Sequence, residues 1–409
     1  MRDGKHLSEG NVDMQLLPGI RVLDLSRVFA GPLCAQVLGD MGADVIKVEH
    51  PVRGDDTRDW GIKIGDTETP YYNSVNRNKR SLALDLKRPQ ARQILMDLAR
   101  QSDVVIHNFK GGDAERMGIA YEDFLQVNPR ILYCHISGYD QHGPERQRPG
   151  YDLVVQGESG LMSLNGEKDT PPLKFGVAVV DMFTGMHAAQ LILAALFKRQ
   201  TDGQPRKLEV ALFDCGLLIS GYYGLEALQM GCEPEKYGNA HPSIVPYGMF
   251  EAADGRLIIT VGNNAQYEKF CRNVVERPDL VEDPRFATNI QRRENRAVLG
   301  PLLIEEIRKH PKARLLERLS AHGIPCGEVL GILEAIRSER VAEAGLLHEV
   351  QHPKAGAMHI FAPPLRVDGQ RLPVRRMPPM LGGDSGEVLS SLLGMDQTRI
   401  DALRAEKII

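Results

Sequence analysis

The sequence predicts an α/β fold, with a large Rossmann-like domain built on a parallel sheet and a smaller α+β domain. Three observations support this prediction. The chain has 409 residues, more than a single hydrophobic core usually organises. Apolar runs typical of strands alternate with helical segments from Gly19 onward, and this alternation ends after about Gly231.

Strand and helix signals follow one another through the first part of the chain. Residues 20–25 form an apolar run of strand type, and the helix after it should begin near Pro32, because proline is favoured in the first turn of a helix. The segments that continue the alternation are strands at 43–49, 103–109, 130–139 and 207–214, a short strand within 76–89, and a helix at 91–102. Because parallel strands are joined by crossover helices, this order predicts a mostly parallel sheet with helices on both faces.

The smaller domain is expected between the two parts of the large one. Residues 246–262 alternate in the manner of a β-hairpin that turns at Ala253, Asp254 and Gly255. Helical segments follow at 264–276, 293–309 and 311–323. The predicted boundaries are therefore 1–225 for the first part of the large domain, 226–331 for the small domain, and 332–409 for a C-terminal segment that returns to the large domain.

Composition and charge exclude several classes of protein. Hydrophobic residues make up 42% and charged residues 25% of the chain, as in ordinary globular proteins. A formal net charge of -4 argues against nucleic acid or an acidic membrane surface as partner. The polar N-terminus contains acidic residues, unlike a signal peptide, and no apolar run is judged long enough to span a bilayer. We therefore expect a cytoplasmic enzyme.

The sequence offers no site for a permanently bound cofactor. The six cysteines are scattered, without a CxxC pair or histidines at zinc spacing, so we expect reduced thiols and no metal site. The loop after the first strand, "SRVFAGP", has one glycine. Close approach of a backbone to a dinucleotide pyrophosphate requires the pattern GxGxxG, so NAD and FAD are not expected.

Basic residues gather around the short strand at 76–89. This basic cluster consists of Arg77, Lys79, Arg80, Lys87 and Arg88, with Arg116 further along the chain. Arginine and lysine side chains in loops suit phosphate groups. The alternative is a solvated basic face without a ligand.

Asp181 allows two interpretations in the stretch "FGVAVVDMFTGMHAAQ". A short apolar run of strand type ends at Asp181, and a helix rich in small residues follows. Aspartate is a favoured N-cap, worth roughly 1 kcal/mol to the helix. A carboxylate at a helix N-terminus would also be kept ionised by the helix dipole. Such a carboxylate can attack an activated carbonyl such as a thioester, with backbone N–H groups stabilising the oxyanion.

Taken together, several segments resemble the class III CoA-transferases, the CaiB/BaiF family. The similarity extends from Pro18 to the C-terminus, and the order and spacing of the segments are specific. The matching segments are "VLDLSRVFAGPLCAQVLGDMGADVIKVEHP", "NRNKRSLALDLKRP", "HNFKGGDAERMG", "ISGYDQHGP", "PGYDLVVQGESGLM", "VAVVDMFTGMHAA", "AHGIPCG" and "PPLRVDG…PPMLGGDSGEVL". The resemblance implies an interlocked homodimer whose substrates are coenzyme A thioesters.

The resemblance also implies roles for particular residues. Asp181 would be the catalytic aspartate, which attacks the donor acyl-CoA to form a mixed anhydride and then an aspartyl-CoA thioester. The residues that match the coenzyme A site are Val28, Phe29, His50, Leu84, Lys87, Asn108, Phe109, Lys110, Arg116 and Tyr151. His50 stands where many members have arginine, and Arg53 is a candidate substitute for it. The basic cluster thereby becomes a predicted ligand site.

The predicted substrates are dicarboxylates. The segments 71–86, 238–255 and 261–271 look most like the branch that transfers CoA from succinyl-CoA to C4–C5 diacids, with glutarate, itaconate, mesaconate and malate as acceptors. Tyr151, His241 and Tyr247 would lie near the acyl group. For His241, the alternative is an incidental histidine in a proline-rich linker.

Two other functions fit the same scaffold. Racemases of this family have histidine at the position of Tyr151, and a phenol with an unperturbed pKa of about 10 is poorly suited to abstracting an α-proton. Tyr151 therefore favours a transferase over an acyl-CoA racemase or isomerase. A CoA-binding protein without catalytic activity is the other alternative.

Overall fold

The computed structural model describes residues 14–409, and the chain divides into two compact units. The first unit comprises residues up to 162, 174–231 and 340–409, and the second comprises 163–173 and 232–339. The segment 163–173, which the sequence had placed in the large domain, belongs to the second unit. Lys236 Nζ fixes it there by donating to the carbonyl oxygens of Thr170 and Pro171, at 2.7 and 3.1 Å.

The first unit is built on a six-stranded parallel sheet of order β3-β2-β1-β4-β5-β6. Its strands are β1 (Arg21–Asp24), β2 (Asp44–Glu49), β3 (Lys79–Ala83), β4 (Val104–His107), β5 (Leu132–Ser137) and β6 (Arg206–Ala211). The predicted parallel sheet is confirmed, and its order is that of a Rossmann fold. The last strand is shorter than predicted, because Leu212 already begins the helix α9 (Leu212–Ile219).

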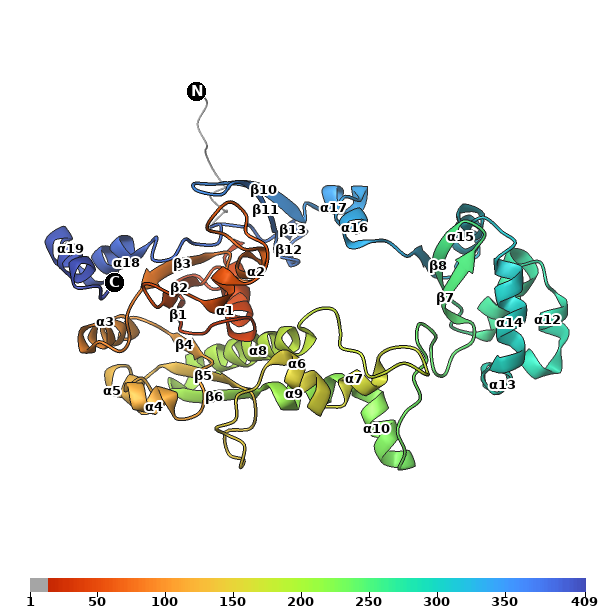
Figure 1. The fold of residues 1–409 in the computed structure, drawn as a ribbon, viewed down its shortest axis with the longest axis horizontal. Coiled ribbons are helices and arrows are strands. Elements are labelled where there is room, and N and C mark those ends of the chain that lie inside the picture. The colour runs from red at the N-terminus through yellow and green to blue at the C-terminus, as the bar shows by residue number, and fades with distance from the viewer. Residues whose placement is uncertain (1–13) are drawn as a thin grey trace, which may run out of the picture. The chain divides into compact units, whose positions relative to one another are not determined.

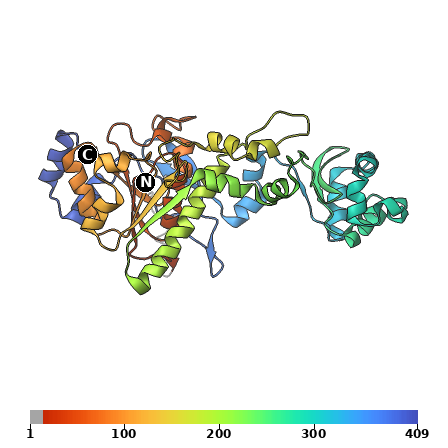
Figure 2. The ribbon, with the colours of Figure 1, turned by 90° about the horizontal axis from the view of Figure 1, so that it is seen from below.

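Helices cover both faces of this sheet (Figures 1 and 2). One face packs against α3 (Pro89–Ala99), α5 (Tyr121–Val127), α18 (Ser385–Leu393) and α19 (Gln397–Ala405). The other packs against α1 (Ala30–Asp40) and α8 (Val179–Asp202). Successive residues of a strand point to opposite faces, so Leu23 lies in the first core and Val22 in the second. As predicted, Pro32 lies in the first turn of its helix.

Helix α8 differs from the expectation that no apolar run in the chain is long enough to span a bilayer. Among the described residues, it alone is long and apolar enough to cross a membrane, since it has 24 residues and a stretch of 18 with a mean hydropathy of 1.5. In the structure it is a packing helix of the first unit, and Val180, Ala188 and Ile192 are fully buried in the core beside α1. The apolar composition of this helix therefore reflects its place in the core.

The second unit contains an antiparallel sheet and several helices. Strands β7 (Tyr247–Ala252) and β8 (Gly255–Thr260) form the predicted hairpin, and β9 (Cys326–Glu328) pairs with β8. The helices α11 (Asn264–Lys269), η3 (Phe270–Val274), α14 (Arg296–Ile307) and α15 (Lys312–Ala321) pack around fully buried Phe270 and Leu299. This arrangement confirms the α+β character of the smaller part.

Shorter elements complete the chain. In the first unit these are η2 (Asp56–Asp59), α2 (Pro70–Ser74), α4 (Asp113–Met117), α6 (Asp152–Glu158), α10 (Gly221–Met230), and the hairpins β10 (Leu347–His352) with β11 (Gly356–Phe361) and β12 (Arg366–Val367) with β13 (Gln370–Arg371). Helix α7 (Leu161–Leu164) includes the boundary between residues 162 and 163, where the chain passes from the first unit to the second. In the second unit they are α12 (Asp279–Glu282), η4 (Pro284–Phe286), α13 (Asn289–Glu294) and α16 (Ile332–Ile336). Helix α17 (Glu339–Ala344) begins at the boundary between the units.

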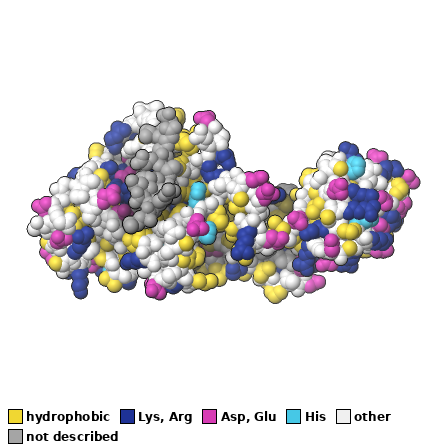
Figure 3. Space-filling view, turned by 90° about the horizontal axis from the view of Figure 1, so that it is seen from above, with side chains coloured by type: hydrophobic (Ala, Val, Ile, Leu, Met, Phe, Trp, Pro, Cys, Tyr) yellow, Lys and Arg dark blue, Asp and Glu magenta, His cyan; other side chains and the backbone are white. Residues whose placement is uncertain are grey.

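The charged surface, the cysteines and the groups that could bind a metal ion are, among the described residues, typical of a globular protein without a metal centre. On the face shown in Figure 3, acidic and basic side chains are interspersed. All six cysteines are unpaired. Within residues 14–409, no group of three or more histidine, cysteine, aspartate and glutamate side chains is arranged to hold a metal ion.

Candidate active site

Two adjacent cavities lie at the carboxyl ends of the parallel strands, where α/β folds commonly bind ligands. The Asp181 cavity is lined by segments that follow β1, β4, β5 and β6 and by the first turn of α8. The Arg116 cavity is lined by segments that follow β1, β2, β3 and β4 and by α4. Both cavities share the same four wall residues: Arg27, Asp56, Phe109 and Asp113. The two cavities are therefore adjacent.

The structure brings most of the predicted site residues together in these cavities. Those that line the Asp181 cavity are Val28, Phe29, Asn108, Lys110, Tyr151 and Asp181. Those that line the Arg116 cavity are His50, Leu84, Lys87 and Arg116, and Phe109 lines both. His241 and Tyr247 belong to the second unit, where their rings are adjacent with centroids 5.0 Å apart.

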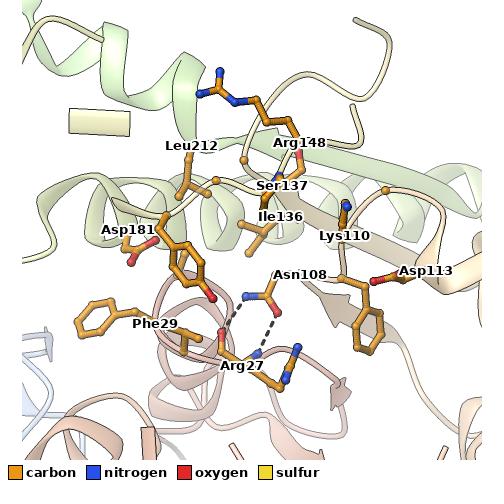
Figure 4. Close-up of a pocket in the computed structure, with 18 of the residues that line it drawn as sticks. Arg27, Phe29, Asn108, Lys110, Asp113, Ile136, Ser137, Arg148, Asp181 and Leu212 are labelled. Carbon is orange, nitrogen blue, oxygen red and sulfur yellow. Dashed lines mark hydrogen bonds between the residues drawn. The ribbon is translucent and has the colours of Figure 1, made fainter. Parts of the chain in front are cut away.

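Asp181 is not the N-cap of its helix, so the capping interpretation is wrong. Residues 175–178 form no strand, and α8 begins at Val179, which places Asp181 in the first turn. The carboxylate of Asp152, the first residue of α6, takes the capping role. Its Oδ2 accepts the backbone N–H groups of Val180 at 2.8 Å and Asp181 at 3.2 Å. The Asp181 side chain is thus left to point into the cavity (Figure 4).

Gln156 fixes the capping carboxylate and the chain that precedes α8. Its Nε2 donates to Asp152 Oδ1, and its Oε1 accepts the backbone N–H of Phe175 at 2.9 Å. One turn of α6 therefore binds both the chain before α8, at Phe175, and the first turn of α8, at Val180 and Asp181. Rigid support of this kind is what a reacting carboxylate needs.

The environment of Asp181 raises the pKa of its carboxyl group to about 7. Burial is the main cause, since the residue is 9% exposed, and the negative charge of Asp152 adds to it. Within the described residues, no cation or hydrogen-bond donor binds this carboxylate. The expectation that the helix N-terminus keeps Asp181 fully ionised is therefore wrong. Near neutral pH the group is about half protonated, and its ionised form is more basic than an ordinary carboxylate.

The wall opposite α8 is a loop locked by Asn108. The Asn108 side chain accepts the backbone N–H of Arg27 at 2.9 Å and donates to the Arg27 carbonyl at 2.7 Å (Figure 4). Phe29 and Ala30 follow at the start of α1, whose N-terminus has no side-chain cap. Unbonded backbone N–H groups at a helix start can bind an anion or an oxyanion.

Cationic side chains line both cavities. Arg27 forms an ion pair with Asp56 at 3.1 Å, and Arg116 forms one with Asp113. Lys87 and Lys110 are exposed and form no ion pair with any described residue. In Figure 4, Lys110 and Asp113 lie on the side of the cavity away from Asp181. The charged wall suits a ligand with several phosphate groups.

Most of the predicted basic cluster has a structural role, which corrects the ligand-site interpretation. Lys79 is fully buried, and its Nζ binds Asp24 at 2.9 Å and the Pro32 carbonyl at 2.8 Å. The remaining partners are Asp40 for Arg77, Asp44 for Arg80 and the Glu406 carbonyl for Arg88. A buried cation needs a partner to offset its desolvation, so Arg77, Lys79 and Arg80 are not available to a ligand. Arg88 is exposed and lines neither cavity. Only Lys87 and Arg116 of the cluster reach a cavity.

Two residues of the site were missed in the sequence. Asp152 directly follows Tyr151, and only the folded chain shows that it caps α8. Tyr71 packs edge-on against Phe29, with ring centroids 5.8 Å apart. Burial raises the pKa of the Tyr71 phenol, and the charge of Asp181 raises it further, so the two groups are near each other. Tyr71 lies in one of the segments used for the resemblance, but nothing in its spacing indicated a role.

The geometry fits the family that the chain matches. Residues 17–385 match CoA-transferase family III, and the chain belongs to this family. It is an enzyme that transfers CoA, as the sequence predicted.

Named relatives and a solved structure agree with this assignment. The chain is 37% identical to succinyl-CoA:glutarate CoA-transferase of Mus musculus, with 97% of this chain and 91% of the relative covered. It is 38% identical to succinate–glutarate CoA-transferase of Agrobacterium fabrum, with 93% and 97% covered. A CAIB/BAIF family protein from Brucella suis superimposes with a TM-score of 0.80 at 35% identity, over 92% of this chain and 98% of that one.

Proposed function

We propose that this enzyme transfers CoA from succinyl-CoA to a C4–C5 dicarboxylate, with glutarate as the first candidate and itaconate, mesaconate and malate as others. The main support is the buried Asp181 carboxyl group, which has no cationic partner and faces a cavity adjacent to a cation-lined one. The choice of dicarboxylates rests on the names of the relatives from mouse and Agrobacterium fabrum.

The two cavities suggest how the thioester binds. The nucleotide end of CoA occupies the Arg116 cavity, where Arg116, Lys87 and His50 face its phosphates and Leu84 contributes an apolar wall. His50 Nδ1 accepts the backbone N–H groups of Val52 and Arg53 at 3.2 and 3.3 Å, so Nε2 is the nitrogen that bears a proton. The thioester end extends past Phe109 into the Asp181 cavity.

Asp181 then takes part in two exchanges. Its carboxylate attacks the thioester carbonyl, the C–S bond breaks, and a mixed anhydride forms with CoA thiolate as leaving group. The thiolate attacks the aspartyl carbonyl, which releases succinate and leaves an aspartyl-CoA thioester. The acceptor carboxylate repeats these steps in reverse and regenerates Asp181. No net proton is consumed, since one carboxylate leaves for each that enters.

Substitution of Asp181 by asparagine tests this proposal. Asp181→Asn should lower the rate of CoA transfer from succinyl-CoA to glutarate by about a thousandfold or more, because the amide is not a nucleophile. Affinity for CoA should change by less than about threefold, because CoA contacts other residues. The melting temperature at pH 8 should not fall, since a neutral amide removes the repulsion with Asp152.

Three outcomes would contradict the proposal. One is near-normal turnover by the Asp181→Asn variant. Another is uptake of deuterium at the α-carbon of an acyl-CoA without any acceptor, which would indicate the racemase. A third is binding of CoA by the wild type with no transfer to any C3–C6 diacid, which would indicate a CoA-binding protein without activity.

The proposal includes a homodimer in the cytoplasm. Helices α9 and α10 expose apolar side chains that a single chain leaves in contact with water, and these are Leu217, Leu218, Tyr222, Leu225, Leu228 and Met230. Exposed apolar patches of this kind mark protein interfaces. The cytoplasmic location is supported by six unpaired cysteines, which are typical of a reducing compartment.

A further inference from the structure

Val28 adopts a backbone conformation that its side chain disfavours. Its φ angle is +73°, in the left-handed region. A β-branched residue is a clear outlier there, and such strain persists only where the surroundings impose it. Val28 lies between Arg27 and Phe29, and all three residues line the Asp181 cavity. Its conformation therefore determines how two neighbouring side chains reach the wall of that cavity.

The group that imposes this conformation is the carboxylate of Asp55. Both carboxylate oxygens accept the backbone N–H of Val28, at 3.2 and 3.3 Å. Thr57 donates its backbone N–H and its hydroxyl to Asp55 Oδ1, at 3.0 and 2.8 Å. Asp55 and Thr57 are both completely buried. Thr57 thus fixes the Asp55 carboxylate, and the carboxylate in turn binds the strained residue Val28.

A buried lysine ties the same carboxylate to the start of the loop. Lys47 Nζ lies 2.9 Å from Asp55 Oδ2 and 2.9 Å from the Ser26 carbonyl oxygen. Burial opposes ionisation of Asp55, but Lys47 and the Thr57 donors hold the pKa of its carboxyl group at about 2. The acceptor for the Val28 N–H is therefore charged at every pH at which the protein is expected to function.

We propose that Asp55 is a positioning residue for the CoA thioester: its buried carboxylate holds Val28 in the left-handed conformation and so sets the place of Arg27 and Phe29 in the Asp181 cavity. This inference rests on the proposed function of that cavity. Asp55 acts through Val28 and takes no part in the chemistry. Its loss should weaken binding of CoA more than it slows the reaction of bound substrate.

The test compares Asp55→Asn in the wild-type protein and in the Val28→Gly background. Binding of CoA itself is measured by calorimetry, and KM and kcat are measured with succinyl-CoA and glutarate. Asp55→Asn should raise Kd and KM about tenfold, as expected for loss of a buried charged hydrogen bond, and change kcat less than threefold. Glycine adopts a positive φ without cost. In the Val28→Gly background, Asp55→Asn should therefore change Kd less than about threefold.

The neighbouring carboxylate provides the matched control. Asp56 binds the Arg27 guanidinium instead of the Val28 backbone, so Asp56→Asn should change Kd by the same factor in both backgrounds. If Asp55→Asn fails to fold, Thr57→Val takes its place, because it removes only one hydrogen bond to Asp55. That variant should raise Kd about two- to fivefold, again only when Val28 is present.

Two results would overturn the inference. One is an equal effect of Asp55→Asn, or of Thr57→Val, in both backgrounds, which would mean that Asp55 acts through overall stability or on CoA directly. The other is an unchanged Kd in a folded variant. Failure of the wild type to bind CoA would instead overturn the proposed function, so the two failures are distinguishable.

Discussion

Asp181 combines two properties that oppose each other. It must be ionised to attack a thioester, yet its burial and the charge of Asp152 favour the protonated form. The smaller ionised fraction is offset by higher reactivity, because a carboxylate whose conjugate acid has a pKa of about 7 is a better nucleophile than an ordinary one. Asp152 has two effects at once, since the carboxylate that raises this pKa also fixes the backbone of Asp181.

The pH dependence of the reaction follows from the raised pKa of Asp181. At pH values well below 7 the ionised fraction of Asp181 falls tenfold per pH unit, so kcat/KM should fall with the same slope. Asp152→Asn keeps an oxygen acceptor for the helix N–H groups but removes the charge that raises the pKa. The acidic limb of the profile should therefore move to lower pH. Rates measured between pH 5 and 9, a range chosen to bracket the pKa of about 7, test this.

A control for the pH experiment exists on the same helix. Asp202 is the last residue of α8 and binds Arg206, far from the reacting group. Asp202→Asn should leave the acidic limb unchanged. An acidic limb that does not move in Asp152→Asn, in an enzyme that is otherwise folded and active, would show that this carboxylate does not control the ionisation of Asp181.

At the scale of elements, the sequence predicted the strands of the sheet and missed the start of α8. Buried parallel strands are nearly continuous apolar runs, and this local signal was sufficient to locate them. The apolar run before Asp181 gave the same signal but is not a strand. Its partner, Asp152, lies 28 residues from Val180 in sequence, and a contact of that separation leaves no local pattern.

The candidate site was predicted only in part, because contacts between residues far apart in the sequence leave no local pattern. Positions such as Asn108 and Leu84 were expected in the site from the resemblance to class III CoA-transferases, and they lie together because residues that follow strands converge at one edge of a parallel sheet. Charged residues within strands were misjudged. Lys79 and Arg80 look like ligand groups in sequence, but Asp24 and Asp44 on other strands neutralise them, and only the folded sheet shows these pairs.

The contact between α1 and α8 makes a prediction about Gly185. A Cβ atom at this position would lie 2.6 Å from the carbonyl oxygen of Ala30, so one helix must move. We expect Gly185→Ala to destabilise the protein by about 1–3 kcal/mol, although alanine is normally favoured within a helix. Because Ala30 lines the Asp181 cavity, KM for the thioester should also rise. Urea denaturation measures the first effect and steady-state kinetics the second.

Gly157 in α6 is the matched control for this substitution. The residue is exposed, and a Cβ atom built there makes an ordinary contact, 3.7 Å from Met162 Sδ. Gly157→Ala should therefore stabilise the protein by about 0.4–1 kcal/mol, through the lower entropy of the unfolded chain. If Gly185→Ala is as stable as Gly157→Ala, the close approach of α1 and α8 does not constrain the site.

At the scale of the whole molecule, the apolar faces of α9 and α10 are the feature that a single chain leaves unexplained. Leu225 is 71% exposed and Leu228 is 82% exposed, and no residue of α10 is buried. Full burial of a leucine side chain is worth roughly 1.5–3 kcal/mol. Four leucine side chains, with Tyr222 and Met230, are exposed on these two helices, which favours association with a second copy, as the resemblance to class III CoA-transferases implies.

The association state tests this directly. Sedimentation equilibrium of the wild type should give twice the mass of the 45.4 kDa chain. Leu225→Glu combined with Leu228→Glu places two charges on the apolar face, which should shift the mass toward that of a single chain and lower the melting temperature. Glu226→Gln, on the same helix, changes charge without altering the apolar side chains and should remain a dimer. A wild type that sediments as a monomer and still transfers CoA would contradict the homodimer.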